Sequence, residues 1–196
     1  RKQFQKISKM MPIYLCHTDE SFYRYIGSKR PGPRVKVTSK RFYISPRLEP
    51  SKDCYDIIYH EISHIVMIQN LGVYRHFLTP VWFHEGLATY VANGGGSGNV
   101  SDSAAISEIL KGNHFYPLVK DNILFQKSFK NKLAPWMNYR QSMLFVKYLK
   151  EKDEDNFRQL IENMNKRISF KKAFENAYNS SVHEMWNTFL VEIRKG

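Results

Sequence analysis

One long helix, predicted over residues 51–71, limits what the rest of the chain can fold into. Ser51 is a suitable N-cap, and Gly72 follows the last turn, where helices often end. An apolar flank along the helix is expected to be buried against other elements. The residues that form this flank are Ile57, Ile58, Ile62, Ile65 and Val66.

The same helix carries two histidines, His60 and His64, four residues apart. Their imidazoles therefore share one helix face, one turn apart, which suits two ligand positions of a tetrahedral zinc ion. Glu61 lies about 60° around the helix from His64, so its carboxylate can take a proton from zinc-activated water without binding the metal. A His-Glu-x-x-His pattern arises by chance in about 1% of such chains, so the interpretation needs a third ligand.

Catalytic zinc usually has three protein ligands and one water, and the downstream candidates for the third ligand are His76, His84 and Glu85. The metzincin family is excluded, because Met67 and Asn70 occupy the positions where it requires glycine and histidine. A second helix is predicted over residues 81–92. If it runs antiparallel to the first, it brings Glu85 to the metal.

The second helix contains the segment Trp82-Phe83-His84-Glu85-Gly86-Leu87-Ala88-Thr89-Tyr90. Together with His60-Glu61-x-x-His64, this segment resembles the gluzincin metallopeptidases. Within them it is most similar to the bacterial peptidase MA-like group, and more distantly to the thermolysin and zinc aminopeptidase families. The resemblance spans about residues 34–194 and is strong only at these two motifs.

The resemblance implies roles for the matching residues. His60, His64 and Glu85 match the zinc ligands, and Glu61 matches the general base. Tyr139 lies where related enzymes often have a tyrosine that stabilises the tetrahedral oxyanion, although packing at a helix start is the alternative for it.

Two histidines, His84 and His114, are the other candidates for donating that hydrogen bond. One position departs from the family pattern: Thr89 stands where some gluzincins have an acid that orients a zinc histidine. That support must come from another group, and Asp56, one turn before His60, is a candidate beside a cap or surface role.

These assignments predict a zinc-dependent metallopeptidase, a hydrolase with one Zn²⁺ per chain that acts on peptides or proteins. Endopeptidase activity is favoured over aminopeptidase activity, because no signature that grips a free N-terminus is visible. A zinc-containing binding or scaffold module without turnover is one alternative. A basic, nucleic-acid-associated protein with structural zinc is another.

The expected fold class is α+β and zincin-like, in a single domain over residues 1–196. A small N-terminal β-sheet lies over the active-site helix in a lobe of about 1–92, and a mostly helical lobe follows over about 99–196. The predicted strands are residues 12–17, 34–38 and 41–45, the last two as a hairpin around Ser39-Lys40. The other predicted helices are 19–26, 103–110, 137–151, 155–163, 169–178 and 182–194.

Two of these segments have expected roles near the site. The strand at 41–45 is expected at a sheet edge, where it can pair with an extended substrate. Residues 94–98, Gly-Gly-Gly-Ser-Gly, are expected as a flexible surface loop or as a mobile rim of the cleft. A turn is predicted at residues 31–33, which are Pro-Gly-Pro.

The net charge of +12 and the 42% hydrophobic content are typical of a globular protein with a basic surface. Nucleic acid is an unlikely partner because the basic residues are scattered and no nucleic-acid motif occurs. No apolar run is long enough to span a membrane. Because the chain starts at Arg1 rather than Met, we expect a preceding segment, and a secreted, periplasmic or membrane-anchored location is slightly favoured over a cytoplasmic one. Cys16 and Cys54 suit either a disulfide or two thiols, and nothing indicates an oligomeric state.

Overall fold

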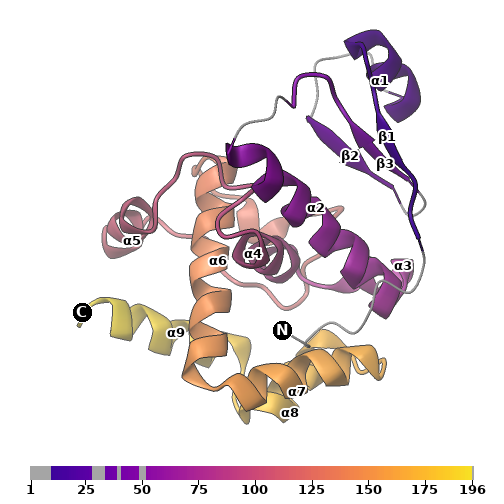
Figure 1. Cartoon of the computed structure of the whole chain (residues 1–196). Coiled ribbons are helices and arrows are strands. Elements are labelled where there is room, and N and C mark those ends of the chain that lie inside the picture. Colours follow the sequence, from indigo (N-terminus) through magenta and orange to yellow (C-terminus); the bar gives the residue numbers. More distant parts are fainter. Residues whose placement is uncertain (1–9, 28–33, 39–40, 49–51, 196) are drawn as a thin grey trace.

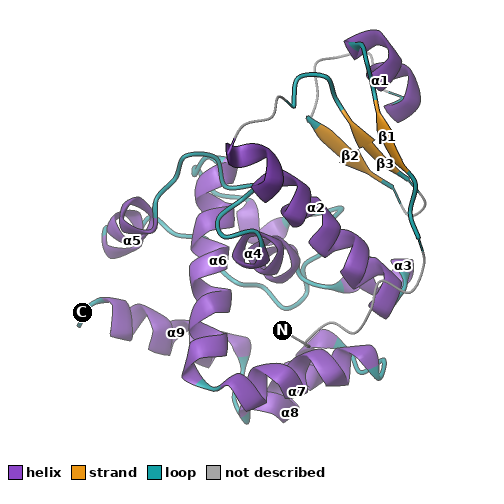
Figure 2. Ribbon diagram, in the orientation of Figure 1, coloured by secondary structure: helices purple, strands orange, loops and turns teal. Residues whose placement is uncertain are grey.

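The computed structural model describes residues 10–27, 34–38, 41–48 and 52–195. The fold is α+β, with a small sheet beside a larger group of helices (Figures 1 and 2). The first elements are β1 (Ile13–Leu15), α1 (Asp19–Ile26), β2 (Val35–Val37) and β3 (Phe42–Ile44). The helices that follow are α2 (Lys52–Leu71), α3 (Val73–Leu78), α4 (Val81–Val91), α5 (Asp102–Leu110), η1 (Lys127–Phe129), α6 (Pro135–Lys152), α7 (Glu154–Asn165), α8 (Phe170–Tyr178) and α9 (Val182–Ile193). Within the described residues, no helix has both the length and the apolar character needed to cross a membrane.

The sheet has the strand order β1-β3-β2, so β3 lies in its centre. It pairs in parallel with β1 and antiparallel with β2, with Tyr43 opposite both Tyr14 and Lys36. The prediction that this strand forms a sheet edge is therefore wrong, because its backbone groups are already used on both sides. In the described part of the chain the two edges are β1 and β2. The turns predicted at 31–33 and at Ser39-Lys40 lie outside the described residues.

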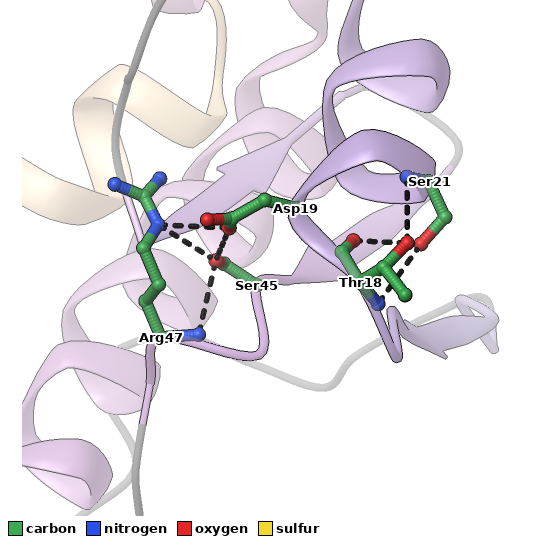
Figure 3. Close-up of polar contacts among 5 residues, drawn as sticks. All are labelled: Thr18, Asp19, Ser21, Ser45 and Arg47. Atoms are coloured by element: carbon green, nitrogen blue, oxygen red, sulfur yellow. Dashed lines mark hydrogen bonds and ion pairs between the residues drawn. The ribbon is translucent and has the colours of Figure 1, made fainter.

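Helix α1 is fixed to the sheet at its first turn (Figure 3). Thr18 and Ser21 form a capping box, in which the Ser21 backbone N–H donates to the Thr18 hydroxyl over 3.1 Å. The Asp19 carboxylate pairs with Arg47 Nε at 3.0 Å, and the Ser45 hydroxyl lies between the two side chains. These contacts join the start of α1 to the chain that leaves β3.

The sheet packs against α2 through a small apolar cluster. Its buried members are Val35 of β2, Phe42 of β3, Ile65 of α2, and Leu48 from the chain between β3 and α2. Ile57, Ile58 and Ile62 of the predicted apolar flank pack against them. The flank of α2 thus faces the sheet, and α2 runs between the sheet and α4 (Figure 1). This is the arrangement expected of a small sheet over the histidine-bearing helix.

The main core is helical and includes α4. Trp82, Phe83 and Leu87 of α4 share one cluster with residues of α6–α9, among them Phe145 and Trp186. A helix that is apolar nearly all round has to lie inside the protein. The packing therefore groups α4 with the C-terminal helices, although its sequence position assigns it to the N-terminal lobe.

Most helices lie within one or two residues of their predicted bounds, as expected where caps and apolar periodicity agree. A capping box of Ser181 and Glu184 begins α9 at the predicted start of that helix. The short elements α3 and η1 were not predicted, and the proposed cap Ser51 lies outside the described residues. Cys16 and Cys54 are both free thiols.

Candidate metal centre

Three side chains from two helices converge on one point. His60 and His64 of α2 bring their Nε2 atoms to 3.2 Å from each other. Glu85 of α4 brings Oε2 to 3.3 Å from His60 Nε2 and 3.6 Å from His64 Nε2. In the described part of the chain this is the group of histidine, cysteine and acidic residues that is placed to hold a metal ion.

These separations fit a zinc-sized ion. Zinc binds nitrogen and oxygen ligands at about 2.0–2.2 Å in a tetrahedron, so neighbouring donor atoms lie about 3.3–3.6 Å apart. The three observed separations, 3.2, 3.3 and 3.6 Å, fall in or close to that range. His64 and Glu85 each keep 14% side-chain exposure, so solvent reaches the group.

The sequence brings Glu85 to the histidines by burying α4 on every other side. Residues 81–89 are all buried except Glu85, which is partly exposed. Gly86 allows the close approach of α4 to α6, because a Cβ there would lie 2.6 Å from the backbone oxygen of Ser142. Glu85 is therefore the partly exposed side chain within residues 81–89, and it faces α2.

The carboxylate of the group suits metal binding. Burial alone would raise the pKa of the Glu85 carboxyl, but His64 and His60 outweigh it and hold that pKa well below its ordinary value. Glu85 is therefore ionised, as a metal ligand must be. Burial lowers the pKa of His64, and the Glu85 and Glu61 carboxylates more than reverse that effect.

Glu61 lies within electrostatic reach of the same three side chains. Burial raises the pKa of its carboxyl, against the opposing influence of His64, His60 and Lys36. A carboxylate whose pKa is raised towards neutrality is better matched to proton transfer at neutral pH.

Tyr139, from α6, also reaches the group. Its ring stacks on the His60 ring, with 6.4 Å between centroids and 25° between planes. Burial, then the charges of Glu85 and Glu61, raise the pKa of its phenol. The hydroxyl therefore stays protonated and can donate a hydrogen bond. The ring also packs against Phe129 and Trp136, so a packing role and a chemical role coexist.

Two further histidines lie beside the group without joining it. The rings of His84 and His76 lie 5.4 and 6.1 Å from that of His64, and both side chains are buried. Burial lowers the pKa of His84 to about 3 and that of His76 to about 4, so both are neutral. His84 Nδ1 lies 3.4 Å from Glu85 Oε1.

The contacts of His114 are with residues outside the metal group, and they give no support to its candidacy as an oxyanion donor. Its ring packs on Trp186 at 5.5 Å, and its Nδ1 bonds to the Phe115 carbonyl. His114 was a candidate because of its residue type alone. Residue type does not indicate where in the fold a side chain packs.

The support of His60 comes from an unexpected residue. His60 Nδ1 bonds over 3.0 Å to the backbone carbonyl of Gly95, with the Thr89 hydroxyl 3.5 Å away. The acceptor is therefore a main-chain oxygen of the glycine run, where Asp56 had been the candidate. Gly94 and Gly95 are buried, so the expectation of a flexible surface loop is wrong there. The only sequence signal for this role is that the glycines directly follow the helix that carries Glu85.

Comparisons with protein-family models, with curated proteins and with solved structures found no match to this chain. The functional interpretation therefore depends on the geometry of the site and on the two motifs.

Proposed function

We propose that this protein is a zinc-dependent metallopeptidase with a zincin-like fold. The proposed ligands of one Zn²⁺ are His60, His64 and Glu85. The observation that carries the proposal is the set of donor separations, which suit three corners of a zinc tetrahedron. Glu61 and Tyr139 beside the same group supply the side chains that peptide hydrolysis needs.

In the proposed reaction, Glu61 and Tyr139 have separate roles. When bound, zinc polarises the scissile carbonyl and makes water acidic enough to react near neutral pH. Glu61 takes the proton of the attacking water and later passes it to the leaving amine. Tyr139 donates a hydrogen bond to the carbonyl oxygen as negative charge develops there.

The proposed position of the substrate is beside β2. β3 is paired on both sides, so an extended peptide has to use an edge strand, and β2 is the edge strand that packs against α2. Lys36 of β2 acts electrostatically on Glu61, which supports the nearness of this edge to the site.

Cleavage of a diverse peptide library, read by mass spectrometry, tests the proposal. Wild type is compared with Glu61→Gln, which keeps all three proposed ligands, and with Glu20→Gln, which changes an exposed glutamate. We expect the wild type and Glu20→Gln to cut and Glu61→Gln to bind zinc without cutting. The cut positions distinguish internal cleavage, which we favour, from removal of terminal residues.

The zinc content of the same samples shows whether a lack of cleavage comes from a lack of zinc or from a lack of turnover. If the wild type binds one zinc and cuts nothing, the chain is a zinc-binding module without turnover, and the peptidase proposal is wrong. If Glu61→Gln cuts as fast as the wild type, Glu61 is not the base.

A further inference from the structure

The chain that follows α4 forms a tight turn against α2. The Gly94 N–H donates to the Thr89 carbonyl over 2.8 Å, and the Gly95 N–H donates to the Ala92 carbonyl over 2.9 Å. The buried Ser97 hydroxyl donates to the Gly94 carbonyl over 2.6 Å. These bonds close the turn on the end of α4 and leave the Gly95 carbonyl directed at His60.

This carbonyl determines which nitrogen of His60 carries the proton. It accepts from His60 Nδ1 over 3.0 Å, and both residues are buried. A carbonyl oxygen can only accept, so Nδ1 must be the protonated nitrogen. Nε2, on the opposite side of the ring, is the nitrogen that faces His64 and Glu85.

The His60 ring fits only because the turn has no side chains. A Cβ on Gly96 would lie 2.4 Å from His60 Nδ1 and 2.5 Å from its Cε1. A Cβ on Gly95 would lie 2.3 Å from the backbone oxygen of Asp56, one turn before His60 in α2. Separations below 3.0 Å require the ring or the helix to move.

The other side of the turn is held by α6. A Cβ on Gly94 would lie 2.7 Å from the Arg140 guanidinium, and Arg140 pairs with Asp102 of α5 at 3.1 Å. The turn is thus enclosed between α2 and α6, which limits the movement of its carbonyl.

We propose that the Gly94–Gly96 turn is the positioning element for His60: its Gly95 carbonyl fixes the Nδ1–H tautomer, and its glycines fix the place of the ring. Because the turn directly follows α4, which carries Glu85, neighbouring segments of the chain provide one ligand and orient another. The inference rests on the metal site of the proposed function, whereas the tautomer of His60 is a property of the metal-free protein.

The first test is the tautomer of His60 in the metal-free wild type. Long-range ¹H–¹⁵N spectra at alkaline pH distinguish a protonated Nδ1 from a protonated Nε2, and a His60→Gln spectrum assigns the signals. We expect a single Nδ1–H form. A predominant Nε2–H form, or a mixture of both, would overturn the proposal, and this measurement requires no change to the turn.

The second test compares Gly96→Ala with Gly112→Ala. Both glycines have positive φ, +85° and +83°, so alanine is strained by the same backbone conformation at either position. A Cβ at Gly112 meets nothing within 4 Å, whereas one at Gly96 meets His60. Zinc affinity is measured by competition with a chelator, and the His60 tautomer is measured on the same variants.

We expect Gly96→Ala to bind zinc roughly 10- to 100-fold more weakly than the wild type, the range for groups that orient metal-binding histidines. Gly112→Ala should keep the wild-type zinc affinity and the Nδ1–H tautomer. Equal affinities in the two variants would overturn the proposal. If the wild type itself binds no zinc, the metal site is wrong, and the tautomer still decides whether the turn positions His60. If Gly96→Ala does not fold, the wild-type tautomer decides in the same way.

Discussion

Replacing Gly86 by alanine tests whether α4 has to approach α6 as closely as the structure shows. The new Cβ would lie 2.6 Å from the backbone oxygen of Ser142 and 2.7 Å from its carbonyl carbon. An ordinary contact needs at least 3.4 Å, so the two helices must separate by several tenths of an ångström. Overpacking of this kind costs about 1–3 kcal/mol, and the better helix propensity of alanine offsets up to about 1 kcal/mol. We expect a net loss of up to about 2 kcal/mol in the free energy of unfolding.

Urea unfolding of the metal-free protein measures this loss, and chelator competition measures the accompanying change in zinc affinity. Because Glu85 precedes Gly86, separation of the helices should also weaken zinc binding. Adding Ser142→Gly should not restore stability, since the obstacle is the backbone of Ser142. A Gly86→Ala protein that is more stable than the wild type would refute the close approach of the two helices.

Three other changes address the chemistry of the site. Glu85→Gln should weaken zinc binding by about 100-fold or more. A structural zinc site with four donors gains about 10–16 kcal/mol in total, so the share of one donor is about 2.5–4 kcal/mol. Competition with a chelator measures the affinity. Tyr139→Phe keeps the ring packing and should lower kcat by about 100-fold or more with zinc affinity unchanged. An unchanged kcat would mean that Tyr139 has only a packing role. The metal-free protein should lose stability as pH falls below 6.5 towards 4, because His84 and His76 protonate more readily in the unfolded chain, where their pKa values are not lowered. Urea unfolding across this range should show that His84→Gln flattens the dependence, and an unflattened curve would contradict the lowered pKa.

The sequence predicted the parts of the structure that local rules control. The i, i+4 spacing of His60 and His64 defines a shared face wherever the segment is helical. This expectation, and the expectation that a second helix brings Glu85 to the metal, agree with the convergence of the three side chains.

The parts that were missed depend on contacts between distant segments. The central position of β3 follows from its parallel pairing with Ile13–Leu15, and short strands carry no local signal for such a partner. The acceptor for His60 is a main-chain carbonyl, which every residue has, so no residue type identified it. His114 illustrates the reverse case, in which a functional residue type serves packing.

The small size of the sheet cluster has a consequence for how the protein responds to heat. Each strand has three residues, and the cluster that joins the sheet to α2 has four buried members, whereas the helical core contains most of the large buried side chains. Regions with few buried apolar contacts undergo subglobal opening at a lower free energy than the rest of a protein. Hydrogen exchange should therefore be faster in β1–β3 than in α4 and α6. On warming, the chain should release a substrate held along β2 before it releases a metal held between α2 and α4.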